Sequence, residues 1–141
     1  MKINFKKLDH VQLIIPKGSE EKARKFYGGL LGLEEIEKPE SLRSTGGVWY
    51  KIAGGELHLG AVQDLQYTKM KLELVKWNVE PGFVFRKKEH PAFEIENLVE
   101  VREFLKENGV WLKEEVPIPG RKRFSISDPF GNRIELLEYD K

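Results

Sequence analysis

The feature that most constrains the fold is an internal repeat, because residues of the first half recur 77 positions later in the second half. The matched pairs are Gly32 and Gly109, Gly54 and Gly131, Leu57 and Ile134, His58 and Glu135, and Leu59 and Leu136. No gap is needed from the end of the predicted helix to the last strand. Before the helix the first copy is three residues longer, which makes His10 equivalent to His90. Self-similarity of this kind predicts two copies of one structural unit.

Each copy shows the same predicted order of a strand, a helix and three further strands. Alternating apolar residues indicate the strands, and helical spacing between a capping residue and a glycine indicates the helices. In the second helix, Val101, Phe104 and Leu105 are predicted to face inward. The first copy has strands at 8–15, 33–36, 48–52 and 56–62 and a helix at 20–31; the second has strands at 90–95 and 110–116, a helix at 98–108, and a hairpin at 123–139.

The length allows one compact domain made of two such units. A chain of 141 residues with 40% hydrophobic content can bury a core. We predict a first βαβββ module at 1–63, a connector at 64–88 and a second βαβββ module at 89–141. The fold class expected from this order is α+β.

Composition excludes several classes of function. The chain has 24 basic and 23 acidic residues, so its net charge of +1 gives no reason to expect nucleic acid or an anionic membrane as a partner. Cysteine is absent, which removes disulfides and thiolate ligands and fits a reducing compartment. No segment approaches the ~20 apolar residues that span a bilayer, and no cleavable leader pattern is present. We therefore expect a soluble, cytoplasmic protein.

Four side chains at repeat-related positions are candidate metal ligands: His10, His58, His90 and Glu135. Strand alternation places each on the face opposite its apolar neighbours. Imidazole nitrogen and carboxylate oxygen suit Zn²⁺, Ni²⁺, Co²⁺, Mn²⁺ or Fe²⁺ where thiolates are absent. A single strand histidine is more often hydrogen-bonded or partly exposed than a ligand. The shared repeat position of all three histidines favours the metal interpretation.

Several segments resemble the vicinal oxygen chelate superfamily, which includes glyoxalase I, extradiol ring-cleavage dioxygenases, and fosfomycin and bleomycin resistance proteins. The matching segments are LDHVQLIIP, EEKARKFYGGLLGLEE, GGELHLG, HPAFEIENLVEVREFLKENGV and SDPFGNRIELLE. The resemblance implies two βαβββ modules that form a cup-shaped mixed sheet around one divalent metal, with the helices outside. The connector at 64–88 is longer than expected for this family.

The resemblance also implies roles for the candidate ligands. His10 and His90 match the first-strand ligands of the two modules, and Glu135 matches the last-strand carboxylate, which also serves as the catalytic base. His58 matches the remaining ligand position. Glu56 lies on the same strand face and is the alternative, but the 77-residue offset favours His58.

Candidate substrate-binding residues lie near Glu135 or on the equivalent first-module strand. Arg123 and Ser125 are predicted across the hairpin from Glu135. Trp49 either lines the pocket or, because it corresponds to Ile126 at the 77-residue offset, belongs to the core. Arg121 and Lys122 are expected on the preceding loop, where surface charge is the ordinary role and anion binding the alternative.

Three functions fit these residues. The first is a metal-dependent isomerase or lyase of the glyoxalase type, in which the metal stabilises an oxyanion of a small oxygen-chelating substrate. The second is a non-haem Fe(II) ring-cleavage dioxygenase, which the set His10, His90 and Glu135 suits. The third is a non-enzymatic ligand-binding or antibiotic-resistance protein. In each case the partner is a small molecule, and the family resemblance implies a homodimer.

Overall fold

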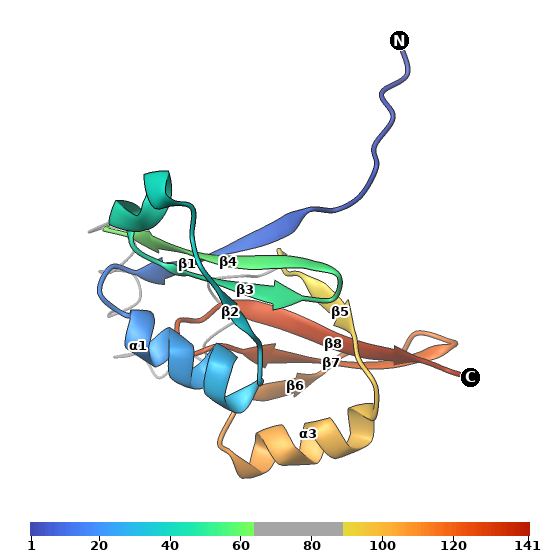
Figure 1. The fold of residues 1–141 in the computed structure, drawn as a ribbon. Coiled ribbons are helices and arrows are strands. Elements are labelled where there is room, and N and C mark those ends of the chain that lie inside the picture. The colour runs from blue at the N-terminus through green and yellow to red at the C-terminus, as the bar shows by residue number, and fades with distance from the viewer. Residues whose placement is uncertain (64–88) are drawn as a thin grey trace. The chain divides into compact units, whose positions relative to one another are not determined.

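The computed structural model describes residues 1–63 and 89–141. The chain divides into two compact units. The first unit comprises residues 1–63 and the second residues 64–141 (Figure 1). The predicted connector at 64–88 lies outside the described residues. The described part of each unit forms a four-stranded mixed sheet, which confirms the predicted α+β class with two modules.

The first unit has a sheet with the strand order β1-β4-β3-β2. β1 pairs with β4 in parallel, and the other pairs are antiparallel. The strands are β1 His10–Pro16, β2 Glu35–Ile36, β3 Val48–Ile52 and β4 Gly55–Val62; the helical segments are α1 Glu20–Ala23, the π-helix η1 Arg24–Leu30 and the 3-10 helix η2 Glu40–Thr45.

The second unit repeats this arrangement with the order β5-β8-β7-β6. Again the first strand pairs in parallel with the last, and the other pairs are antiparallel. The elements are β5 Ala92–Glu94, α3 Leu98–Glu107, β6 Leu112–Glu114, β7 Arg121–Ser127 and β8 Arg133–Tyr139.

The register between the first and the last strand of each unit confirms the repeat. Gln12 pairs with His58 in the first sheet, and Ala92, which is equivalent to Gln12, pairs with Glu135 in the second. His58 and Glu135 therefore occupy the same place in their sheets. The three-residue difference before the helix and the 77-residue offset on the last strand are both correct.

The predicted correspondence of Trp49 with Ile126 is wrong. Trp49 pairs with His58, whereas Ser125 pairs with Glu135, so Trp49 is equivalent to Ser125 at an offset of 76 residues (125 − 49). The second turn is one residue longer between equivalent positions: two residues separate the paired Ile52 and Gly55, whereas three separate Asp128 and Asn132, so the gap-free offset of 77 does not hold on β3. Side chains alternate along a strand, so this one-residue shift moves Trp49 from the face equivalent to Ile126 onto the face of His58.

The longer turn is built around the buried Asp128. One carboxylate oxygen, Oδ1, accepts hydrogen bonds from the backbone N–H groups of Phe130 (2.9 Å) and Asn132 (2.7 Å). The other, Oδ2, accepts from the Asn132 side-chain amide at 2.8 Å. An aspartate that binds backbone N–H groups ahead of it in the chain stabilises a turn. This turn fixes where β8 begins.

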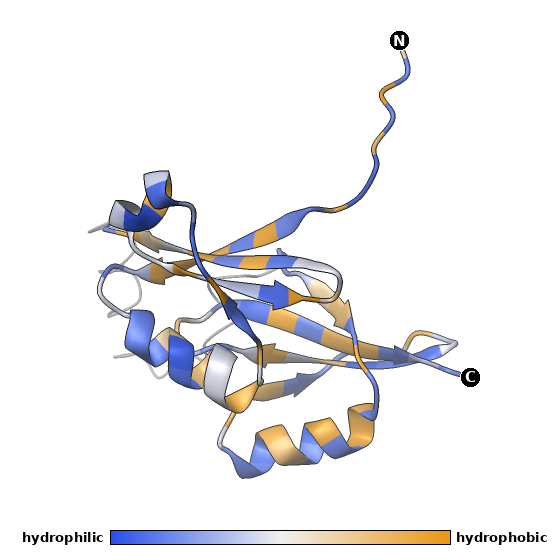
Figure 2. Ribbon diagram, viewed as in Figure 1, coloured by the Kyte–Doolittle hydropathy of each residue, from blue (hydrophilic) through white to orange (hydrophobic). Residues whose placement is uncertain are grey.

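Apolar side chains form the core of each unit. Polar and apolar residues alternate over the first four residues of β1 and of β8 (Figure 2), which places one side of each strand inward there. The buried apolar residues of the first unit are Leu13, Ile15, Ala23, Phe26, Tyr27, Val48, Tyr50, Leu57 and Leu59; those of the second are Leu98, Leu105, Phe124, Ile126, Phe130, Ile134, Leu136 and Leu137.

The helices depart from the predictions in two details. The predicted helix 20–31 is α-helical only over its first turn, and in η1 the Leu31 N–H reaches back five residues to the Phe26 carbonyl at 2.9 Å. In α3 the prediction for Phe104 is wrong, because its side chain is 47% exposed while Leu98 and Leu105 are buried. At 100° per residue, position 104 lies about a quarter turn away from the stripe formed by Leu98 and Leu105.

No helix within residues 1–63 and 89–141 is both long and apolar enough to cross a membrane.

Gly47 offers a test of the packing between β3 and β4. Its φ is +86°, and a Cβ at this position would lie 2.1 Å from the Leu59 carbonyl oxygen. Gly54 also has a positive φ, +77°, but a Cβ there would meet nothing within 4 Å. We expect Gly47→Ala to lower the free energy of unfolding by at least about 3 kcal/mol, from strain and overlap together.

Gly54→Ala is the matched control, with an expected loss of about 1–2 kcal/mol from backbone strain alone. Urea denaturation of both variants measures the difference. If both variants lower the free energy of unfolding equally, the backbone near Leu59 moves away from the added Cβ at little cost in free energy.

Candidate functional site

Three aromatic rings are stacked on one face of the first sheet. The rings of Trp49 and His58 are 3.6 Å apart between centroids and 2° from parallel. The rings of His58 and His10 are 4.2 Å apart and 15° from parallel. Because β4 lies between β3 and β1, the His58 ring lies between the other two.

Carboxylates hold both histidines of this stack. His58 is 5% exposed, and its Nε2 lies 2.8 Å from Glu56 Oε1. His10 is more open, with 44% of its side chain exposed, and its Nδ1 lies 2.9 Å from Asp9 Oδ2. A carboxylate on one ring nitrogen orients an imidazole, which is how metal-binding histidines are usually held. In His10 this leaves Nε2 to face a metal ion.

The stacking limits how His10 and His58 can bind metal. An imidazole nitrogen donates its lone pair in the plane of the ring, at about 2.0–2.1 Å from the metal. Two ring planes 15° from parallel with centroids 4.2 Å apart do not meet within such a distance. In this arrangement at most one of the two histidines can bind a given ion.

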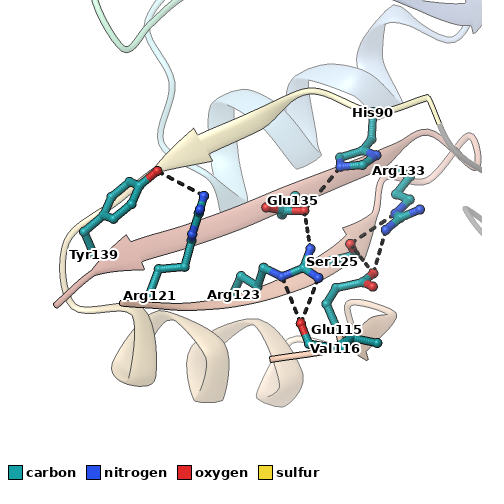
Figure 3. A network of polar contacts seen from close by, with 9 residues as sticks. All are labelled: His90, Glu115, Val116, Arg121, Arg123, Ser125, Arg133, Glu135 and Tyr139. Atoms are coloured by element: carbon teal, nitrogen blue, oxygen red, sulfur yellow. Dashed lines mark hydrogen bonds and ion pairs between the residues drawn. The ribbon is translucent and has the colours of Figure 1, made fainter. Parts of the chain in front are cut away.

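In the second unit, Glu135 lies between a histidine and an arginine (Figure 3). Its Oε1 is 3.2 Å from His90 Nε2 and accepts a hydrogen bond from Arg123 Nη1 at 2.9 Å. Arg123 is fixed in turn, since Nε and Nη2 both donate to the Val116 carbonyl, at 3.2 and 2.8 Å. Glu135 is only 7% exposed. A buried carboxylate with charged partners is typical of functional sites as well as of structural ion pairs.

A second charged pair lies beside Glu135. Arg133 Nη2 lies 2.8 Å from Glu115 Oε1, and the Ser125 hydroxyl donates to the same oxygen at 2.7 Å. The hydroxyl also accepts a hydrogen bond from Arg133 Nε at 3.1 Å. Ser125 is fully buried. It therefore joins an arginine to a glutamate (Figure 3).

These contacts shift the protonation of Glu115. Burial alone would raise the pKa of this carboxyl, but the hydrogen bond from Ser125 and the positive charges of Arg133, Lys113 and Arg123 outweigh burial and hold the pKa below its ordinary value.

The structure brings the predicted ligands together in pairs. His10 and His58 lie together in the first unit, and His90 and Glu135 lie together in the second. Within the described part of either unit, no group of three or more His, Asp or Glu side chains is placed to hold a metal. That His10, His90 and Glu135 share one ion stays a prediction.

Sequence reasoning missed Glu115 and Arg133. A signal for Arg133 was present, because it lies two residues before Glu135 and so projects from the same face of β8. Glu115 lies just after β6 and carried no signal of its own. Arg121 and Lys122 were expected on a loop, but they open strand β7.

Known proteins similar to this chain share its two-module fold. Residues 7–136 match the sequence model of the Glyoxalase/Bleomycin resistance protein/Dioxygenase superfamily. The chain is 37% identical to a protein of the glyoxalase family from Bacillus anthracis, with 99% of this chain and 100% of that chain covered and a TM-score of 0.80. Among curated proteins, none matches significantly.

Two solved structures at lower identity share the fold alone. The fosfomycin resistance protein FosX from Listeria monocytogenes is 21% identical, with 97% of this chain and 96% of that chain covered and a TM-score of 0.68. TnmS3, an antibiotic binding protein from Streptomyces sp. CB03234, is 19% identical, with 99% and 100% covered and a TM-score of 0.64.

The lowered pKa of Glu115 predicts a pH-dependent contribution to stability. A carboxyl whose pKa is lower in the folded state stabilises the fold above its ordinary pKa of 4.5, and this stabilisation is lost as the pH falls through the lower, folded value. Ser125→Ala removes the hydrogen bond to Glu115. We expect it to lower the free energy of unfolding by about 1–2 kcal/mol near neutral pH, with a smaller difference from wild type below pH 4.5.

Ser127→Ala is the matched control on the same strand, because the buried Ser127 hydroxyl donates to the backbone carbonyl of Asp128 at 2.9 Å. A carbonyl does not titrate, so the effect of this variant should not depend on pH. Denaturant unfolding at several pH values measures both. Parallel pH profiles for the two variants would contradict the role given to Ser125.

Proposed function

The chain belongs to the Glyoxalase/Bleomycin resistance protein/Dioxygenase superfamily, and on that premise we propose that it is a divalent-metal-dependent enzyme of the glyoxalase type, an isomerase or lyase whose substrate has two adjacent oxygens. The observation that carries the proposal is the pair His90 and Glu135, an imidazole nitrogen and a buried carboxylate oxygen 3.2 Å apart. Both donor types suit Zn²⁺, Ni²⁺, Co²⁺, Mn²⁺ or Fe²⁺.

The proposed ligands are His10, His90 and Glu135. His10 Nδ1 is bonded to Asp9, so Nε2 is the nitrogen suited to the metal. The parallel stack argues that His58 is not a ligand together with His10. We assign His58 a positioning role, because Glu56 holds its ring and Trp49 packs against it. A locked neighbour of this kind restricts the rotation of the His10 ring.

The chemistry follows from the groups around Glu135. A bound divalent ion would polarise the substrate oxygens and stabilise an oxyanion. Arg123 donates to Oε1 of Glu135 and so orients the carboxylate, which leaves Oε2 to take a proton from the substrate carbon and return it. The low exposure of Glu135 limits competition from water. The sequence alternative of a non-haem Fe(II) dioxygenase uses the same three ligands.

A second candidate function, non-enzymatic ligand binding, is favoured by Arg123. Its guanidinium and His90 both contact Oε1 of Glu135, so one oxygen is already bonded within the protein. An ion pair that is satisfied in this way needs no metal. The homodimer and the cytoplasmic location expected from the sequence stay predictions.

Metal content tests the proposed function. Protein prepared without chelator or histidine tag, and then soaked separately with each of the five ions, should hold about one equivalent of one of them. Glu135→Gln and His10→Ala should each weaken metal affinity at least about tenfold, because each removes a ligand. Elemental analysis and calorimetric titration measure the two quantities.

His58→Phe is the control, since it keeps an aromatic ring between Trp49 and His10 but removes both nitrogen donors. It should leave the stoichiometry near one ion per chain. If His58→Phe weakens metal affinity as much as Glu135→Gln does, His58 is a ligand. If wild-type protein holds less than about a tenth of an equivalent of metal and takes up none on soaking, the metal-dependent functions are excluded and non-enzymatic ligand binding remains.

A further inference from the structure

Three arginines lie on the same face of the β7–β8 hairpin as Glu135. Arg121 and Arg123 alternate with the exposed Lys122 and the buried Phe124 along β7, and Arg133 precedes Glu135 by two positions on β8. The opposite face of the hairpin carries apolar residues of the core, Phe124, Ile126, Ile134 and Leu136. Alternation therefore gathers the positive charges on one side of the sheet (Figure 3).

Two of these arginines are neutralised within the protein. Arg123 pairs with Glu135 at 2.9 Å, and Arg133 pairs with Glu115 at 2.8 Å. Arg123 also donates hydrogen bonds from Nε and Nη2 to the Val116 carbonyl oxygen. Neither guanidinium needs an external anion for its charge.

Arg121 differs from the other two, because its partner is uncharged. Its Nη1 donates to the Tyr139 hydroxyl at 3.1 Å, and its guanidinium carbon lies 5.0 Å from the centre of the Tyr139 ring. Among the described residues, no carboxylate pairs with it, and its buried Nε has no hydrogen-bond partner. A buried N–H without a partner is costly, and a guanidinium presents its donors in a fork that suits carboxylate or phosphate.

Arg121 can be reached from a cavity. It lines a cavity of about 280 Å³ at the edge of β7. The other lining residues come from α3, from the segment after it and from β7: Leu98, Val99, Arg102, Glu114, Glu115, Pro117, Lys122, Arg123 and Phe124. The cavity opens where β6 has ended, since β6 pairs only with residues 124–126 of β7. Tyr139 itself is 49% exposed.

We infer that Arg121 binds an anionic group, a carboxylate or a phosphate, at the end of the substrate remote from the metal. Tyr139 is directly opposite Arg121, and Ser125 is opposite Glu135, so the anion site is displaced from Glu135 by four residues of β8, about 13 Å along the strand. The ligand is therefore elongated, with its chelating oxygens at one end and its negative charge at the other. The position of the chelating oxygens beside a metal rests on the proposed function, whereas the anion site at Arg121 does not.

Metal-free protein tests the anion site by itself. The probe is hydrocinnamate, which has a carboxylate on a short apolar arm, and its uncharged analogue is hydrocinnamyl alcohol. We expect hydrocinnamate to shift the NMR signal of the Arg121 Nε–H, which is assigned by its loss in Arg121→Gln. The alcohol should leave this signal in place. No shift with hydrocinnamate, or equal shifts with both compounds, would overturn the inference.

Zinc-loaded protein tests the remote position of the charge. Hydrocaffeate, its methyl ester and dopamine share a metal-chelating catechol and carry a negative, a neutral and a positive remote group. Titration calorimetry should show hydrocaffeate binding at least about tenfold more tightly than the ester, and dopamine most weakly. Arg121→Gln should abolish this preference.

Lys106→Gln is the matched control, because it also removes one positive charge from this unit, at an exposed residue of α3 outside the lining of this cavity. It should leave the preference for hydrocaffeate unchanged. A preference that survives Arg121→Gln, or that Lys106→Gln removes equally, would overturn the assignment of Arg121. Failure of zinc to bind would not bear on the anion site, since the metal-free titration decides that site independently.

Discussion

The structure depends on one repeated interaction, the parallel pairing of the first strand of each unit with its last. In the first unit this pairing is between β1 and β4, and in the second between β5 and β8. Parallel register fixes which residues lie side by side, and alternation then fixes which face each side chain takes. His58 and Glu135 become equivalent through this register. A slip of one residue would place the candidate ligands in the core.

The two units use the same strand positions for different physical purposes. In the first, the position of His58 carries an imidazole stacked between an indole and a second imidazole. In the second, the equivalent position carries Glu135, with Arg123 and His90 as partners. The two units share one strand arrangement, and their faces differ: one carries stacked aromatic rings and the other carries charged pairs.

Buried charge on the second face is tolerated because nearly every charged group has a partner. Breaking one partner of a buried pair leaves an uncompensated charge, which costs far more than a surface ion pair contributes. Glu135 with Arg123 and Glu115 with Arg133 satisfy this requirement. Arg121 differs from these arginines in the part of the unit that the structure describes, since a tyrosine hydroxyl accepts its hydrogen bond without neutralising its charge. That imbalance distinguishes Arg121 from its neighbours.

The sequence alone determined the two-module α+β fold, the equivalence of His58 with Glu135, and the strand faces of His10 and His58, whereas His90 lies two residues before β5. These properties follow from local periodicity and from the spacing of the repeat, which a single chain displays directly. Only the tertiary structure placed Trp49 on His58, because hairpin register depends on how each turn closes. It alone joined Glu115 to Arg133 through Ser125, since such contacts connect side chains that no sequence period relates. It alone showed that no carboxylate within residues 1–63 and 89–141 pairs with Arg121, because pairing among several charges is decided by distances in space.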